Sequence, residues 1–180
     1  MSHFASADDL QHELVAFLTA FLGSDDGVRA VEAARSLGQS ATLVVHTTDP
    51  EAVVSVDFFA GSVSLDARED ADVEIQLEAD ALHDVLMNRL DPVQLSRLYE
   101  TDRLAFSGAS QHLGALIMLA GPMQPHYPVS LARRGRDDLL NTPMPPTKEA
   151  WGSPEDALAP KRVIGRRRPW QRPKRTAEAV

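Results

Sequence analysis

The sequence contains no cysteine and no long run of hydrophobic residues. Without cysteine, the chain has no disulfide framework, no thiolate nucleophile and no zinc site that uses sulfur. Because a helix needs about 20 consecutive apolar residues to cross a bilayer, we expect no membrane-spanning segment. The first residues carry an acidic pair and no basic cluster, so we also expect no secretory signal and a cytoplasmic protein.

The sequence also lacks the motifs of common catalytic and metal sites. Its 6 histidines are spread singly, and none forms a pair with metal-ligand spacing. There is no glycine-rich phosphate loop, and Gly108-Ala109-Ser110 lacks the flanking pattern of a nucleophile elbow. The acidic residues between Asp66 and Asp72 lack the glycine spacing of a calcium loop. We therefore expect a binding protein rather than an enzyme, without cofactor or metal.

The net charge of −8 is the sum of two opposite parts. Residues 1–128 carry 6 basic and 20 acidic side chains, a net of −14, whereas residues 129–180 carry 12 basic and 6 acidic ones, a net of +6. Of the 12 prolines, 7 follow residue 128. The sequence thus predicts a folded domain over residues 1–128 and an extended, disordered tail rich in proline and arginine over residues 129–180.

Two helices are predicted at the N-terminus. Apolar residues recur at three- and four-residue steps over residues 6–22, and Ser6 with Asp9 forms a capping pair. The second helix, over residues 25–37, would place Val28, Val31 and Leu37 on its inward face.

The pattern then changes to the two-residue period of β-strands. Four short strands joined by turns are predicted at residues 41–47, 53–59, 63–67 and 72–77. Their simplest arrangement is an antiparallel meander with one face in water.

Helical periodicity returns after the fourth strand. Asp80 is the predicted N-cap of a helix over residues 81–90, and a second short helix follows over residues 92–99. A fifth strand at residues 103–108 and a last helix at residues 111–120 complete the domain. This order predicts an α+β fold, with a single curved, mainly antiparallel five-stranded sheet covered by helices.

Four short segments follow one another as in a known family. They are the turn Phe59–Val63, the aspartate-led strand Asp72–Leu77, the segment Leu82–Pro92, and the strand Leu104–Gly108 with the helix after it. On these segments the chain resembles the sterol carrier protein type 2 family over about residues 41–123. It departs from the family at Glu100–Arg103, where members carry glycine and lysine, and at Ala109, where an acidic residue is common.

The resemblance implies a non-catalytic module with an apolar tunnel for a fatty acyl chain, a sterol or an isoprenoid. Apolar walls suit such ligands, because a buried polar group without a partner is costly. The candidate wall residues for ligand binding are Phe58, Leu82, Leu86, Phe106, Leu113 and Ile117. The same residues would also be buried in a filled core, so the sequence leaves both interpretations open.

The basic tail is the other informative feature. Residues 161–175 hold 8 basic side chains and no acid, and both tryptophans of the protein lie beyond residue 150. Such a segment could bind nucleic acid or anionic lipid headgroups, or could wrap a protein partner. We favour docking on a protein partner through residues 141–180, because apolar anchors accompany the charge. The predicted partner-binding residues are Trp151, Val163, Ile164, Arg166, Arg167, Arg168 and Trp170.

Three functions therefore stay open. The first is a lipid- or acyl-binding accessory protein that docks through its tail, with peripheral membrane contact allowed. The second is a purely structural subunit of a larger assembly with the same fold and a filled tunnel. The third and least favoured is a nucleic-acid-associated protein.

Overall fold

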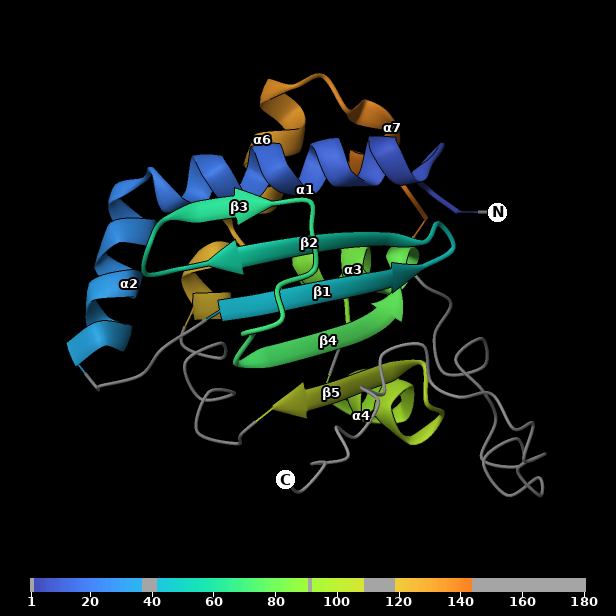
Figure 1. Cartoon of the computed structure of the whole chain (residues 1–180). Coiled ribbons are helices and arrows are strands. Elements are labelled where there is room, and N and C mark those ends of the chain that lie inside the picture. Colours follow the sequence, from blue (N-terminus) through green and yellow to red (C-terminus); the bar gives the residue numbers. More distant parts are fainter. Residues whose placement is uncertain (1, 37–41, 91, 109–118, 144–180) are drawn as a thin grey trace, which may run out of the picture.

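One five-stranded sheet organises the molecule (Figure 1). The computed structural model describes residues 2–36, 42–90, 92–108 and 119–143. The strands are β1 (Thr42–Thr48), β2 (Ala52–Asp57), β3 (Ser62–Ser64), β4 (Val73–Glu78) and β5 (Leu104–Gly108). The helices are α1 (Ala7–Leu22), α2 (Asp25–Ser36), α3 (Ala79–Leu86), α4 (Pro92–Glu100), α6 (His126–Arg133) and α7 (Asp137–Leu140). The predicted α+β class with a mainly antiparallel sheet is confirmed, and the helix predicted at residues 111–120 lies mostly outside the described residues.

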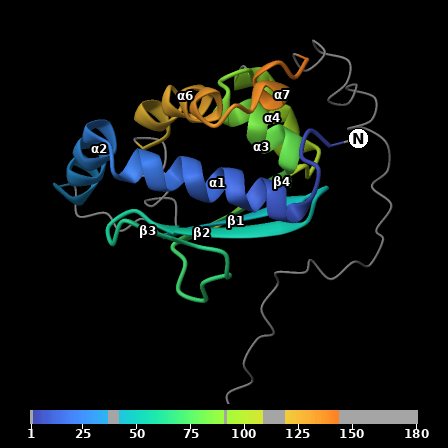
Figure 2. The same ribbon diagram turned by 90° about the horizontal axis from the view of Figure 1, so that it is seen from above.

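The strand order β3-β2-β1-β4-β5 corrects the predicted meander. Strands β1, β2 and β3 do pair as successive antiparallel hairpins, but β4 lies on the other side of β1 and runs parallel to it. The connection from β3 to β4 crosses the sheet on the side away from the helices (Figure 2). Asp72 positions the start of β4 beside β1. Its N–H donates to the Thr42 carbonyl (3.0 Å), and its carboxylate accepts from the Thr42 N–H (2.9 Å).

The described helices lie on one face of the sheet (Figure 2). Alternation along the strands explains this arrangement, because every second side chain points to the same face. Leu43 and Val45 of β1 and Val54 and Val56 of β2 are buried on the helix-facing side, where α1 packs on β2 and β3. The opposite face carries half-buried residues, among them His46.

Helix α1 confirms the predicted cap and the predicted apolar face. The Ser6 hydroxyl accepts from the Asp9 N–H (3.2 Å), and the Asp9 carboxylate accepts from the Ala5 N–H (3.0 Å). The apolar residues at three- and four-residue steps are buried: Leu10, Leu14, Phe17, Leu18 and Phe21.

Helix α2 confirms Val31 on the buried face but differs from the prediction at Val28, which is 47% exposed. The other buried residues of this face are small, namely Gly27, Ala30 and Ala34, and Leu37 lies outside the described residues. Gly27 explains why α2 approaches α1 so closely, since a Cβ at this position would lie 2.0 Å from the Phe21 carbonyl oxygen. A face with such close contact has little room for large side chains.

Helix α3 begins earlier than predicted, at Ala79, and Asp80 is not its N-cap. The carboxylate of Asp80 instead accepts from the Ser2 hydroxyl (2.9 Å) and the His3 N–H (2.8 Å). The helix also ends early, at Leu86. Asn88 follows with a φ of 54°, a left-handed conformation that asparagine adopts more readily than most residues. Asp80 thus binds the N-terminal segment instead of capping its own helix.

Packed structure continues past residue 128, where the sequence placed the end of the domain. Leu131 of α6 and Leu139 of α7 are fully buried in the same core as Phe17 and Phe58. The division of the chain into domain and tail stays a prediction, and this packing favours a boundary after residue 142. None of the described helices has the length and apolar character that a membrane span requires.

Candidate functional site

The predicted tunnel-wall residues fall into three groups. Phe58 is 1% exposed and belongs with Leu86 to the buried core between sheet and helices. Leu82 is half-buried and packs against that core. Leu113 and Ile117 lie outside the described residues. The structure therefore brings three of the six to one apolar layer.

Phe106 occupies a different environment. It lies on the same face of β5 as the buried Leu104, paired with Ile75 of β4, and is 41% exposed. Its ring centroid is 6.2 Å from that of Tyr99 on α4, which is 59% exposed. We call Tyr99 and Phe106 the α4–β5 apolar surface. Adjacent exposed aromatic side chains are candidates for a binding surface.

A hollow of about 340 Å³ lies on the open face of the sheet, and charged side chains form part of its lining. Glu51, Glu69 and Glu74 line it together with His46 and Arg68. Its acidic character makes it unsuitable for an acyl chain, because the carboxylates would lose their hydration. Among the described residues, no group of histidine and acidic side chains could hold a metal ion.

A second hollow, of about 480 Å³, lies between α1 and α6. Phe17, Phe21 and Pro125 form part of its lining, and Val129 of α6 is exposed beside it. We call this site the α1–α6 hollow. The other residues of its lining are Ala16, Ala20, Ser24, His126, Ser130, Arg133 and Arg134.

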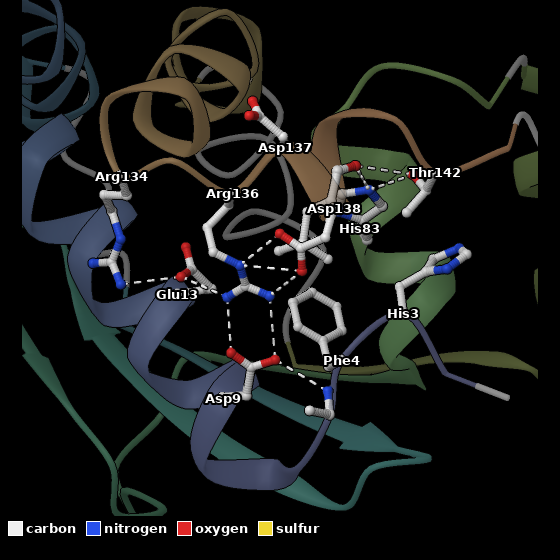
Figure 3. A network of polar contacts seen from close by, with 12 residues as sticks. His3, Phe4, Asp9, Glu13, His83, Arg134, Arg136, Asp137, Asp138 and Thr142 are labelled. Atoms are coloured by element: carbon white, nitrogen blue, oxygen red, sulfur yellow. Dashed lines mark hydrogen bonds and ion pairs between the residues drawn. The ribbon is translucent and has the colours of Figure 1, made fainter.

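A buried polar network connects α3 to the C-terminal segment (Figure 3). His83 is buried, with Nε2 3.1 Å from the Leu139 carbonyl and 3.0 Å from the Thr142 hydroxyl. Since a carbonyl only accepts, Nε2 carries the proton and Nδ1 accepts from the Tyr127 hydroxyl at 3.0 Å. Arg89 donates to the carbonyls of Leu140 (3.0 Å) and Thr142 (3.2 Å). These contacts hold the segment after α7 against α3.

Burial sets the charge state of this network. Desolvation lowers the pKa of His83 to about 4, and Arg89 acts in the same direction. Desolvation likewise raises the pKa of the neighbouring Asp84 to about 6. Among the described atoms, Oδ1 of Asp84 has no hydrogen-bond partner, and Nη1 of Arg89 lies 3.7 Å away. At neutral pH His83 is therefore uncharged, which suits a structural role.

A second network joins the loop after α6 to α1 (Figure 3). Nη1 of Arg136 lies 2.7 Å from Asp9 and 2.8 Å from the buried Glu13, and Nη2 lies 2.8 Å from Asp138. Arg134 also contacts Glu13, at 3.0 Å. The hydrogen bonds to Asp138, Asp9 and Glu13 raise the pKa of the Arg136 guanidinium. Together the two networks fasten residues 134–142 to the domain.

These networks could not be predicted, because the histidines are spread singly in the sequence and residues 131–142 fall in the predicted tail. The one available signal was an arginine next to acidic residues within a proline-rich extension, Arg136-Asp137-Asp138. The predicted partner-binding residues, from Trp151 to Trp170, lie outside the described residues.

Fold and site together define a small α+β protein in which one face of an open, mixed sheet is covered by helices. Solved structures similar to it are of the kind that the sequence resemblance named. A structure described as "UbiJ-SCP2 Ubiquinone synthesis protein" has 22% identity and a TM-score of 0.46, covering 63% of this chain and 90% of its own.

Two further structures are sterol carrier proteins. Sterol carrier protein 2 from Yarrowia lipolytica has 13% identity and a TM-score of 0.45, covering 66% of this chain and 91% of its own. Sterol carrier protein 2 like 2 from Aedes aegypti has 14% identity and a TM-score of 0.35, covering 43% and 68%. No family model matches the sequence, and no curated protein does.

Proposed function

We propose that this protein binds one apolar molecule, a fatty acyl chain, a sterol or an isoprenoid, and that it is not an enzyme. The observation that carries the proposal is the α4–β5 apolar surface. Phe106 points to the same side of the sheet as the core, yet keeps 41% of its surface exposed beside the ring of Tyr99. An aromatic pair left open at the edge of an apolar layer offers an apolar ligand a place to enter.

The test compares two substitutions of exposed apolar residues. Phe106→Gln removes an aromatic contact from the proposed site, whereas Leu65→Gln alters a residue that is 49% exposed elsewhere. An aromatic contact worth about 1.5–3 kcal/mol corresponds to a loss of binding of roughly tenfold or more. We expect Phe106→Gln to weaken uptake of a fluorescent fatty acid by that factor and Leu65→Gln to leave it unchanged. Equal affinities in the two variants would place the ligand elsewhere.

A structural subunit with a filled interior is the second candidate. It is favoured by the packing of Phe58 and Leu86, predicted wall residues that are buried in the described core. In this case the wild-type protein takes up no lipid at all. The two candidates therefore differ in the wild-type titration, before any variant is made.

We further propose that the basic tail docks the protein on a protein partner in the cytoplasm. The proposed anchors are those of the sequence analysis: Trp151, Val163, Ile164, Arg166, Arg167, Arg168 and Trp170. The packing of Thr142 against His83 supports a tail that leaves the domain at a defined point.

The tail proposal predicts the behaviour of a chain that ends at Pro143. This truncation keeps Leu139 and Thr142 in their buried contacts, so we expect a folded domain that unfolds cooperatively. The full chain should co-purify with a protein that the truncated chain loses. If the truncated chain still co-purifies with it, the tail does not dock. A complex that is instead nucleic acid would weaken by orders of magnitude with salt.

A further inference from the structure

The α1–α6 hollow differs from the rest of the domain in its charge. None of the described residues that line it is acidic, although residues 1–128 carry a net charge of −14. Its polar side chains include Arg133, Arg134 and His126. This combination of an apolar lining and positive charge favours an occupant with an apolar group and flanking acids.

Existing ion pairs leave part of this positive charge available. Arg134 is bound to Glu13 (3.0 Å) and His126 to Asp26 (3.0 Å). The side chain of Arg133, at the C-terminal end of α6, is exposed and has no hydrogen bond or ion pair with any described residue. Ala20 and Val129 of the lining are exposed, so part of the apolar lining is accessible from outside.

The chain itself contains a segment of this chemistry shortly after its last described residue. Residues 147–159 carry Trp151 together with three acids, Glu149, Glu155 and Asp156, and one base. This acidic stretch precedes the basic run that begins at Lys161. An indole ring is the largest apolar group available, and a hollow of about 480 Å³ lies within the range of roughly 300–1,000 Å³ of ligand pockets.

The segment is long enough to reach the hollow. Thr142 is held at His83, whose ring lies 5.9 Å from that of Phe4, just before α1. With a rise of about 1.5 Å per residue, the part of α1 at Ala20 lies roughly 20 Å further along the helix. The 8 residue steps from Pro143 to Trp151 span about 26–29 Å when extended, and the three prolines of this stretch favour that conformation.

We propose that Trp151 docks into the α1–α6 hollow of its own chain, with Glu149, Glu155 and Asp156 facing Arg133 and Arg134. The inference goes beyond lipid binding and rests on neither the lipid ligand nor the protein partner. It places the first part of the tail on the domain and leaves Val163 to Trp170 for the partner. A partner that also takes Trp151 must first displace it from the hollow.

Tryptophan fluorescence tests the proposal directly, because the protein has 2 tryptophans and both lie in the tail. In the full-length variant Trp170→Phe, Trp151 is the only tryptophan, and excitation beyond the absorption band of tyrosine selects its emission. We expect its emission to lie at shorter wavelength than that of a synthetic peptide of residues 144–160, and its quenching by acrylamide to be reduced. Both differences should shrink as salt rises, because exposed charges contribute to the contact.

A matched pair of substitutions locates the contact. In the Trp170→Phe background, Ala20→Glu places an acid in the hollow and should return the emission and quenching of Trp151 to the peptide's values. Ala33→Glu makes the same change at an exposed alanine of α2 outside the hollow, and should alter neither. Circular dichroism shows whether both variants are folded. The proposal is wrong if Trp151 in the Trp170→Phe variant emits at the wavelength of the free peptide. It is also wrong if Ala20→Glu leaves the emission wavelength of Trp151 unchanged. A fluorescent fatty acid that binds in the hollow without changing the emission of Trp151 would overturn it as well.

Discussion

His83 and Asp84 are adjacent in α3, and burial shifts their pKa values in opposite directions. The pKa of His83 falls to about 4 and that of Asp84 rises to about 6, in both cases mainly because the charged form loses hydration. Between pH 4 and 6 the folded protein therefore keeps His83 neutral and Asp84 protonated. The unfolded chain does the reverse, with a charged histidine and a charged aspartate. Neither pKa shift can be predicted from the sequence, because two adjacent helical residues do not show how deeply each will be buried.

The signs of the two contributions oppose each other. For His83 the unfolded state binds the extra proton, so its contribution to the free energy of unfolding falls as pH falls from about 6.5 to 4. For Asp84 the folded state binds the extra proton, so its contribution falls as pH rises from about 4 to 6. The pair thus gives little net pH dependence between pH 4 and 6.

Replacing Asp84 by asparagine should leave a free energy of unfolding whose pH dependence comes from His83. We expect Asp84→Asn to become less stable relative to wild type as pH falls from 6 to 4.5, by about 1–2 kcal/mol. Urea unfolding at several pH values measures the difference. A difference in unfolding free energy between Asp84→Asn and wild type that does not change with pH would contradict the protonated state assigned to this residue.

Local signals predicted those elements in which cap and apolar spacing agree. Helix α1 follows its capping pair and its apolar spacing, and the strands follow their alternation. The start of α3 and the pairing of β4 could not be predicted, because each depends on a distant partner. Asp80 is engaged by Ser2 and His3, and Asp72 places β4 beside β1. Alternation shows which face a strand buries but not which strand it joins.

The segment that contains α6 and α7 depends on ion pairs as well as on apolar packing. Arg136→Gln should remove the contacts to Asp9, Glu13 and Asp138 and leave the buried carboxylate of Glu13 with Arg134 alone. We expect a loss of about 1–3 kcal/mol in the free energy of unfolding. Arg29→Gln removes an exposed pair with Asp26 and should cost less than about 0.5 kcal/mol. Equal losses in urea unfolding would show that the Arg136 network does not stabilise the segment.

On the scale of the whole molecule, the candidate site was predicted only in part. The sequence selected Phe58, Leu82, Leu86 and Phe106 because they are large and apolar, and all four lie on the helix side of the sheet or pack with its core. It could not distinguish buried core from open surface, because size and hydrophobicity are the same in both. The difference between Phe58 and Phe106 arises from what covers each ring in three dimensions.

The acidic and basic parts of the sequence contribute to different surfaces of the structure. Three glutamates and one arginine line the hollow on the open face of the sheet, whereas the lining of the α1–α6 hollow contains two arginines and no acidic residue. Those arginines follow residue 128 and fold back onto an acidic domain. The sequence therefore located the change from acidic to basic composition. In the structure, the first part of the basic segment forms ion pairs with the domain.

Native mass spectrometry of the full-length protein tests the central claim, lipid binding, most directly. The protein is purified without detergent and measured both as isolated and after incubation with oleate. We expect one bound lipid per chain, present on purification or acquired on incubation, and its loss in Phe106→Gln but not in Leu65→Gln. A wild-type protein that repeatedly shows no lipid mass and acquires none does not bind lipid, and the proposed function would then be wrong.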